Sequence, residues 1–186
     1  MKVQYTSQTD YGRVYPVGCM SIGQLKREIR HYVCDNYYDI DIKNAHPVCL
    51  KNVCMEMNIP CDRLNDYCEN RKQIIKSYKK KYGMSRDETK RLYIAMINCA
   101  NYKKYFPEKH IRKRKNHAKE FYNEINTTVK VISKKSLELR KKLLNGVENP
   151  WDGSFMSRYL QMYECMILEE AYKYCLKQEV IGSDNN

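Results

Sequence analysis

Two aspartates in the stretch NYYDIDIKNAHPVCL, residues 36–50, could hold a metal ion. Asp39 and Asp41 are two positions apart, so in an extended strand they lie on one face. Asp is depleted in strands, and a carboxylate that faces a core is costly. A strand over 36–42 that turns both carboxylates to solvent, followed at once by a helix, could bind Mg²⁺ together with substrate phosphates. The alternative interpretation is an ordinary solvent-facing strand edge.

A second set of candidate residues lies on one face of a helix predicted over 85–106. Arg86 and Lys90 are four residues apart and therefore project from the same side. Asn98 continues this row two turns later. Two cations one turn apart suit a triphosphate, and an amide further along could meet a base or a sugar. A solvated helix face is the competing interpretation.

A third feature is the basic segment KKYFPEKHIRKRKNHAK, residues 103–119. Aromatic residues precede its densest part, and the whole chain has a net charge of +12. Such a segment suits contact with a phosphate backbone, which carries affinity without sequence information. A solvated face is again the alternative. The candidate nucleic-acid contacts here are Lys103, Lys104, Arg112, Lys113, Arg114 and Lys115.

Most of the elements that must position these residues are predicted to be helices. Capping-box patterns begin helices at Ser21 and Ser85. Residues 1–20 are turn-like and strand-like, and the strand over 36–42 leads into a helix that ends near residue 57. Further helices are expected over 63–83, 85–106, 115–144 and 154–176. The final residues, GSDNN, are typical of a disordered tail.

Composition narrows the class of protein. Apolar residues make up 42% of 186 residues, which indicates a folded chain with a real core. The nine cysteines include no C-x-x-C pair, so a zinc site has weak support and reduced, buried thiols are expected. There is neither a signal-peptide pattern nor an apolar run of membrane-spanning length. These features predict an intracellular protein that makes no use of a membrane.

The order of these segments resembles family A DNA polymerases. YGRVYPVGCMSIGQLKREIR resembles the stretch of that family that runs T-G-R, serines, L-Q and an arginine, and it assigns Arg13 and Gln24 to nucleic-acid contact. DIDIKNAHPVCL resembles polymerase motif A, with Asp41 at the position of the first catalytic aspartate. The same segment is similar to the D-x-x-S-L-Y-P motif of family B. In both families the side chain five residues later packs on the sugar, and here that residue is His46.

Two later segments extend the resemblance to residue 175. RDETK matches the R-x-x-x-K of the family A fingers helix, which implies that Arg86 and Lys90 are triphosphate ligands. ENPWDGSFMSRYLQMYECMILEEAY loosely resembles the palm segment N-x-P-x-Q-G-S and its helix. Asp152 replaces the Gln of that pattern. Similar compact motif A segments occur in polymerase-like proteins of large DNA viruses and mobile elements.

The resemblance implies an α+β, predominantly helical fold: a partial polymerase palm with short β-strands and helical fingers. Residues 1–57 would form the palm part with motif A, residues 58–145 a fingers-like region, and residues 146–186 a helix returning to the palm and a disordered tail. The implied activity is template-directed nucleotidyl transfer with Mg²⁺, a nucleoside triphosphate and a DNA primer–template. Asp41 would be the catalytic metal ligand, with Asp39 as a second metal-site carboxylate.

The sequence departs from the family where a second palm carboxylate should follow the last helix, because only KQEVIGSDNN remains there. The chain is therefore expected to be a fragment, one half of a split polymerase completed by a second polypeptide, or a remnant that is inactive alone. The alternatives are a non-catalytic nucleic-acid-binding protein, a single-subunit RNA polymerase-like fragment, and a structural helical protein.

Overall fold

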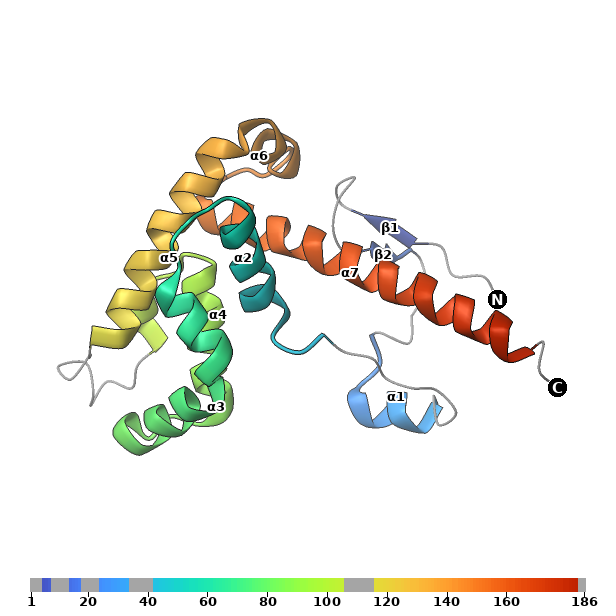
Figure 1. Ribbon diagram of the computed structural model, residues 1–186, viewed down its shortest axis with the longest axis horizontal. Helices are drawn as coiled ribbons and strands as arrows, with labels where there is room; N and C mark the ends of the chain where they lie inside the picture. Colours follow the sequence, from blue (N-terminus) through green and yellow to red (C-terminus); the bar gives the residue numbers. More distant parts are fainter. Residues whose placement is uncertain (1–4, 8–13, 18–23, 34–41, 106–115, 184–186) are drawn as a thin grey trace.

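The computed structural model describes residues 5–7, 14–17, 24–33, 42–105 and 116–183 (Figure 1). Its two strands, β1 (Tyr5–Ser7) and β2 (Val14–Pro16), pair antiparallel with Tyr5 opposite Pro16. Every other regular element is helical. The helices are α1 (Arg27–Val33), α2 (Ala45–Glu56), α3 (Asp62–Tyr82), α4 (Arg86–Ile97), the 3₁₀ turn η2 (Tyr102–Tyr105), α5 (Asn116–Lys135), α6 (Leu137–Leu143) and α7 (Asp152–Ser183).

The predicted α+β palm is wrong. Among the described residues the only sheet is this ribbon of two three-residue strands, and a two-stranded ribbon is at best marginally stable alone. Residues 36–41 of the predicted motif A strand lie outside the described residues, and Ile42 is not in a strand. The fold class is therefore predominantly helical, with the helices themselves supplying the core.

The core is built from aromatic side chains of three helices. Tyr67 of α3 and Tyr93 of α4 stack with ring centroids 4.0 Å apart, and Phe121 of α5 meets the Tyr93 ring edge-on at 4.9 Å. All three side chains are fully buried. Such pairs add roughly 0.5–1.5 kcal/mol each beyond their burial. This cluster fixes α4 between α3 and α5.

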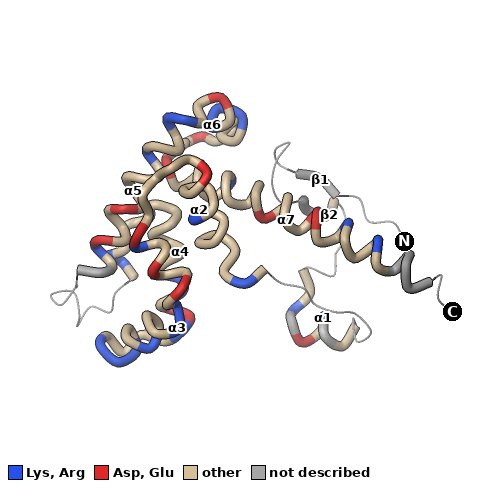
Figure 2. The backbone as a smooth tube through the Cα atoms, in the orientation of Figure 1, with Lys and Arg blue, Asp and Glu red and all other residues tan. Residues whose placement is uncertain are grey.

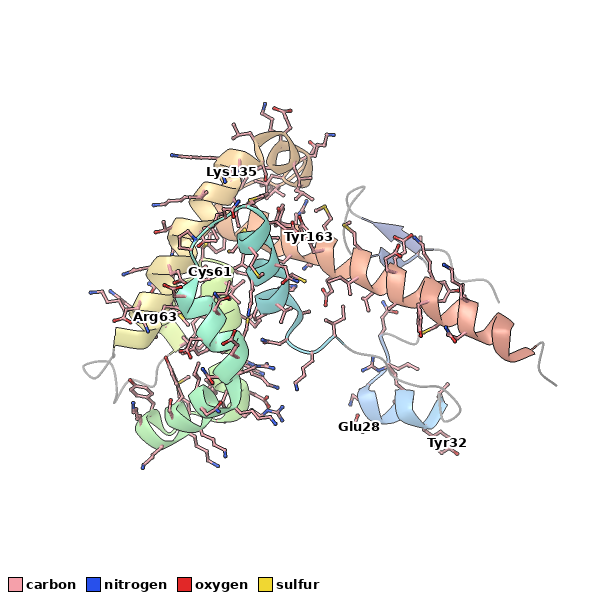
Figure 3. The ribbon with its side chains drawn as sticks, viewed as in Figure 1. Glu28, Tyr32, Cys61, Arg63, Lys135 and Tyr163 are labelled. Carbon is pink, nitrogen blue, oxygen red and sulfur yellow. The ribbon has the colours of Figure 1, made fainter. Side chains whose placement is uncertain are left out.

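Polar contacts join the two long helices α3 and α5. The Glu124 carboxylate on α5 accepts hydrogen bonds from the backbone N–H groups of Arg63 and Leu64 at 2.9 Å each, so it caps the start of α3. The Arg63 side chain pairs with Glu120 of α5 at 2.7 Å. At the other end of α5, Lys135 donates to the backbone oxygen of Met57 at 2.9 Å (Figure 3).

The residues of helix α7 that are buried, among those the structure describes, lie in its first half. Phe155, Met156, Tyr159 and Leu160 are buried, and α7 contacts α2, α5 and α6. Figure 1 shows the helix continuing past α2 and away from the other long helices. It ends at Ser183, so the predicted disordered tail is wrong for its first two residues; residues 184–186 lie outside the described part.

Several helix ends differ from the sequence prediction. The capping box at Ser85 is confirmed, whereas the one predicted at Ser21 lies outside the described residues. The single helix predicted over 115–144 is divided at Ser136, whose φ of −116° and ψ of 40° are not helical. Helix α7 starts at Asp152, so Ser154 lies inside its first turn rather than capping it.

Basic residues lie in the last turns of α3, α5 and α6 (Figure 2). The last turn of α3 carries Lys79, Lys80 and Lys81, and the last turn of α6 carries Arg140, Lys141 and Lys142. Cations there interact favourably with the negative end of the helix dipole. Within the described ranges, the helices are too short or too polar to cross a membrane.

Candidate functional site

Helix α4 begins with a well-formed cap that points its first turn at solvent. Ser85 N–H donates to the Glu88 carboxylate at 2.6 Å, and the Ser85 hydroxyl accepts from Glu88 N–H at 3.2 Å. The hydrogen bond from the Ser85 backbone holds the pKa of Glu88 below its ordinary value. The reciprocal bonds satisfy two backbone donors and set where the next residues project.

The two cations predicted on this helix lie near its exposed first turn. Arg86 is exposed and has no ion-pair partner among the described residues. Lys90 is partly buried, and its Nζ lies 3.5 Å from Asp87 Oδ1. An i,i+3 pair of this kind is weak and exchangeable, because exposed ion pairs contribute roughly 0–1 kcal/mol. The Lys90 ammonium therefore remains able to bind an anion.

Helix α4 ends earlier than the predicted residue 106, and the chain then folds back over it. Asn98 closes the helix with its N–H donating to the Ile94 oxygen at 3.1 Å, and Cys99 adopts a positive φ of 55°. Ala100 N–H then donates to the Ala95 oxygen at 2.8 Å. This left-handed step ends the helix and brings η2, with Tyr105, alongside α4.

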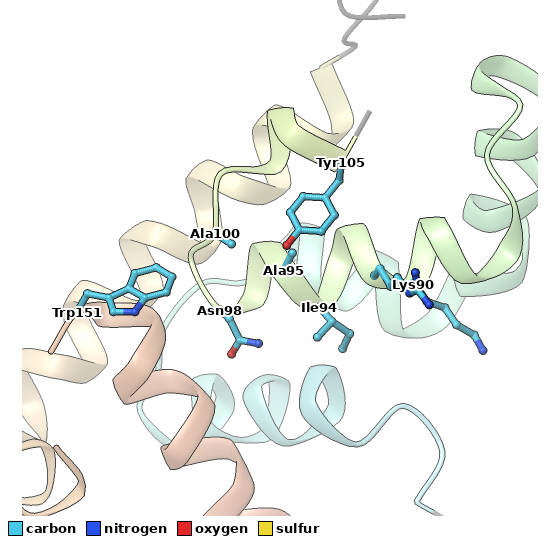
Figure 4. Close-up of a pocket in the computed structure, with 8 residues that line it drawn as sticks. Lys90, Ile94, Ala95, Asn98, Ala100, Tyr105 and Trp151 are labelled. Carbon is cyan, nitrogen blue, oxygen red and sulfur yellow. The ribbon is translucent and has the colours of Figure 1, made fainter. Parts of the chain in front are cut away.

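A cavity of about 500 Å³ lies along this face of α4. Figure 4 shows Trp151 at one end and Lys90 at the other, with Asn98 and Tyr105 between them. The rest of its lining is mostly aliphatic. Its lining residues are Lys90, Arg91, Ile94, Ala95, Asn98, Ala100, Tyr105 and Trp151. The cavity is an open hollow on the surface, so a ligand bound in it would stay partly exposed to solvent.

One polar atom in the lining lacks a partner. Asn98 Oδ1 is buried and accepts no hydrogen bond from the described residues. A buried acceptor without a donor costs about 1–3 kcal/mol. Because protein atoms cover this oxygen, a ligand N–H in the cavity would reach it only after the Asn98 amide turns toward the cavity.

The Trp151 wall is held in place by the start of α7. A Cβ built on Gly153 would collide with the backbone oxygen of Asn98 and with the Trp151 ring, whose Cζ2 is 2.6 Å away. Only glycine therefore allows α7 to approach the end of α4 this closely. Asp152 is anchored by Arg140 at 2.7 Å, and the Arg140 guanidinium lies over the Phe155 ring. Asp152 stands where the palm pattern has Gln, and its carboxylate forms an ion pair with Arg140.

The structure brings some predicted residues together and separates others. Lys90 and Asn98 share the cavity, while Arg86 lies one turn before it. Lys103 and Lys104 are exposed on η2 beside Tyr105. Gln24 is exposed and belongs to a short turn before α1. Arg13, Asp39, Asp41, Arg112, Lys113, Arg114 and Lys115 lie outside the described residues.

His46 does not line the cavity. It lies in the first turn of α2, and its Nε2 is 3.6 Å from Glu164 Oε2 on α7. Burial raises the pKa of the nearby Cys49 thiol, and the Glu164 carboxylate raises it further. The Cys49 thiol therefore stays protonated at neutral pH, which argues against a cysteine nucleophile beside His46.

The predicted magnesium site has no counterpart in the described part of the chain. No group of three or more His, Cys, Asp or Glu side chains gathers there. Asp39 and Asp41, which carry the prediction, lie outside it, so their role stays a prediction. Trp151 and Tyr105 were missed by sequence reasoning. The position of Trp151, the sole tryptophan, within the palm-like segment was the available signal.

Comparison with known proteins gives a distant match. The chain is 26% identical over 180 residues to the "Putative helicase V13" of Sputnik virophage. The match covers 92% of this chain and 23% of that protein, so the chain spans about a quarter of the relative's length. Neither a protein-family profile nor a solved structure matches the sequence.

Proposed function

We propose that this chain is the nucleotide-holding part of a DNA polymerase-like nucleotidyl transferase from a viral replication system, acting inside the infected cell. One observation carries the proposal. Two segments that separately resemble family A polymerases, the helix from Arg86 and the loop before α7, meet at one cavity through Asn98, Trp151 and Gly153.

The dimensions of the cavity suit a nucleoside triphosphate. Lys90 and Asn98 are eight residues apart on α4, which is about 12 Å at ~1.5 Å per residue. Lys90 and Arg91 would contact the phosphates, with Arg86 reaching them from one turn earlier. Asn98 Oδ1 would accept a hydrogen bond from the base once its amide turns toward the cavity. Trp151 offers an aromatic face on which a base can stack, at roughly 1–3 kcal/mol per base.

Nucleic acid would bind beside the same cavity. Lys103 and Lys104 are exposed next to Tyr105, and the segment that follows carries most of the remaining predicted phosphate contacts. With a net charge of +12, binding should be dominated by phosphate neutralisation. Arg13 and Gln24 are proposed as further nucleic-acid contacts, and His46 as a sugar contact, from the resemblance alone.

Catalysis would need two sets of metal-binding carboxylates, and this chain is proposed to contribute one of them. Asp41, with Asp39, is proposed to hold Mg²⁺, which when bound would activate a primer hydroxyl and brace the triphosphate. One candidate carboxylate site cannot by itself hold two metal ions in the required geometry. A second polypeptide, or a longer form of the chain, is proposed to supply the other carboxylate.

The runner-up function is nucleic-acid binding without catalysis. The relative is named a helicase, a class that also combines nucleic acid with a nucleoside triphosphate. This sequence does not contain the G-x-x-x-x-G-K-[ST] phosphate loop of such enzymes. The polymerase-like interpretation of the triphosphate contacts is favoured by the resemblance of the segment that begins at Arg86, and the basic surface is common to both functions.

The sole tryptophan allows a direct test. Trp151 is 48% exposed at the cavity rim, so a bound base should quench its fluorescence. We expect saturable quenching by a nucleoside triphosphate. We also expect a Kd roughly ten to a hundred times higher for Lys90→Ala, since a charge-assisted contact is worth about 1.5–3 kcal/mol. Asn98→Ala should weaken binding of the nucleoside triphosphate and of the nucleoside alike.

The matched control is Lys141→Ala, which removes an exposed lysine of α6 that does not line the cavity. It should leave the Kd unchanged. Absence of quenching by every nucleoside triphosphate, or equal effects of Lys90→Ala and Lys141→Ala, would overturn the nucleotide site. Salt-sensitive binding of single-stranded DNA in that case would favour the runner-up function.

A further inference from the structure

The second half of helix α3 carries a concentration of positive charge. The helix is kinked at Asn70, whose φ of −103° and ψ of 19° are not helical. Residues 62–69, before the kink, include three acidic residues and one arginine, whereas residues 71–81 include six basic residues and no acidic one. Figure 2 shows Lys and Arg gathered where α3 ends. Charges of opposite sign are therefore separated along this helix instead of being mixed.

Four of these lysines form one row along the helix. We call them the α3 lysine stripe: Lys72, Lys76, Lys79 and Lys80. Their spacings of three and four residues place them on one side of the helix. All four are exposed, and none has an ion-pair partner among the described residues. From the first to the last, the helix rises about 12 Å at ~1.5 Å per residue.

The opposite side of this half-helix is part of the core. Ile74, Tyr78 and Tyr82 are buried there. The Tyr78 ring meets the Tyr93 ring of α4 edge-on, with centroids 5.8 Å apart, and the Tyr93 hydroxyl donates to the Tyr78 hydroxyl at 3.3 Å. These contacts fix the second half of α3 to α4, so the α3 lysine stripe is held on a packed helix and faces solvent.

Solvation of a helix face does not account for the α3 lysine stripe. On α7, by comparison, the Lys173 Nζ lies 2.8 Å from the Glu170 carboxylate. Lys76 instead has a lysine four residues before it and another four residues after it, and like charges at that spacing destabilise a helix. The helix dipole favours cations of the last turn only, whereas Lys72 lies ten residues before the end of α3. An anionic partner would offset this repulsion.

The surroundings of the α3 lysine stripe disfavour a membrane as that partner. A helix that lies on a membrane inserts an apolar face and carries its lysines on the other side. Here the apolar face of the same half-helix is buried against α4. None of the large exposed apolar residues of the described chain lies between residues 71 and 83. The stripe therefore offers charge without a group that could enter the bilayer.

The chemistry of the row favours a nucleic-acid strand over an acidic protein. Protein interfaces are depleted in Lys and depend on aromatic and Arg anchors, which the stripe does not contain. Lysines act on phosphates as point charges. A strand presents its phosphates one after another, so it can meet several lysines of a row about 12 Å long at once.

We propose that the α3 lysine stripe binds the phosphate backbone of a nucleic-acid strand. The inference rests on the nucleic-acid partner of the proposed function and adds a surface that holds it. This surface is separate from the α4 cavity, because none of the four lysines lines that cavity. Contacts to phosphate carry no sequence information, so the stripe binds strands of different sequence alike.

A salt titration of oligothymidylate binding to the full chain tests the α3 lysine stripe. The stripe variant combines Lys72→Gln, Lys76→Gln and Lys80→Gln. The slope of log affinity against log salt should become shallower by about two, since each phosphate contact contributes about 0.7 for a single strand. If the two titrations meet near 1 M salt, this slope gives roughly hundredfold weaker binding near 0.1 M. Glutamine is a good helix former and removes the lysine repulsion, so the Tm should stay equal or rise.

The matched control removes the same charge from exposed lysines of α6 and α7, through Lys141→Gln, Lys173→Gln and Lys177→Gln. It should leave the slope unchanged and the affinity within about twofold, because exposed charges beyond the Debye length of about 8 Å are largely screened. Equal losses in the two triple variants would assign binding to net charge alone and overturn the proposal. A stripe variant that keeps the original slope would overturn it as well.

Nucleotide binding separates this inference from the proposed nucleotide site. The stripe variant should keep the Kd for a nucleoside triphosphate, measured by Trp151 quenching, since the stripe lies outside the α4 cavity. Absence of quenching in the unsubstituted chain, together with a salt slope that depends on the stripe, would overturn the nucleotide site and support the stripe. Binding to phosphatidylglycerol vesicles that is lost in the stripe variant, with oligothymidylate binding retained, would overturn the stripe as a nucleic-acid surface and assign it to a membrane.

Discussion

Replacing Gly153 with alanine tests the contact that builds one wall of the cavity. The added Cβ would overlap the backbone oxygen of Asn98 and the Trp151 ring. The ring can rotate away, but the carbonyl is fixed by the end of α4. We therefore expect α7 to shift at its first turn and Trp151 to move toward solvent.

The net cost follows from two opposing effects. Alanine is favoured over glycine in a helix by about 1 kcal/mol. Overpacking against a fixed backbone costs about 1–3 kcal/mol. A clash with backbone places the overpacking cost near the upper end, so the expected net loss of unfolding free energy is about 2 kcal/mol. In a chain of 186 residues, each 1 kcal/mol lowers the Tm by about 2–4 °C, which gives a drop of roughly 4–8 °C.

Thermal melting and tryptophan emission measure the two effects separately. Gly153→Ala should lower the Tm and shift the Trp151 emission to longer wavelength. Gly83→Ala is the matched control, because its φ of +66° makes alanine strained while nothing lies within 4 Å of the added Cβ. It should lower the Tm by a similar amount with unchanged emission. An unaltered Tm and emission in Gly153→Ala would refute the close approach of α7 to α4.

Three other predictions concern the proposed reaction, the basic segment and the buried Tyr78. Lys90→Ala should weaken triphosphate binding more than Asp41→Ala does, because only the lysine is proposed to touch phosphate without a metal. Primer extension by the chain alone should be negligible, and robust extension would disprove the proposal that a second catalytic carboxylate is missing from this chain. Lys113→Glu with Arg114→Glu should lessen the slope of log affinity for DNA against log salt by about two phosphate contacts; an unchanged slope would assign these residues to a solvated face. Burial raises the pKa of Tyr78 from 10.0 to about 12, so as the pH rises the Tyr78 hydroxyl ionises in the unfolded chain before it does in the folded chain. The contribution of Tyr78 to the free energy of unfolding is therefore full below about pH 10 and falls as the pH rises toward 12. Denaturant melts across that range should show the decline, and Tyr78→Phe should show less of it.

Local hydrogen-bonding signals in the sequence predicted the helix start that matters most for the site. The Ser85–Glu88 box was predicted from residue types three apart, and both of its bonds are present. Such a cap depends on a few adjacent residues, so no tertiary information is needed to find it. The division at Ser136 could not be predicted in this way, because the apolar spacing continues across it from α5 into α6.

The cavity depends on contacts that helical spacing cannot show. Spacing placed Lys90 and Asn98 on one side of a helix, and both residues line the cavity. The return of Tyr105 requires the positive φ of Cys99, a residue type that rarely adopts it. The position of Trp151 requires a glycine at 153 to meet a carbonyl more than fifty residues earlier. Neither condition leaves a periodic signal.

The fold prediction failed because it transferred a sheet from the polymerase resemblance. Two chains can share the order of short motifs and still differ in their layers of helices and sheets. Short motifs fix local geometry, whereas the layers depend on the rest of the chain. Here the aromatic contacts of Tyr67, Tyr93 and Phe121 hold α4 without any sheet beneath it. The α4 face is thus positioned by helices alone, so a test of nucleotide binding at Lys90 and Asn98 does not depend on the palm. The Asn98 oxygen is buried without a hydrogen-bond donor from the described residues. Whether a nucleotide binds beside it is what the Lys90 and Asn98 variants measure.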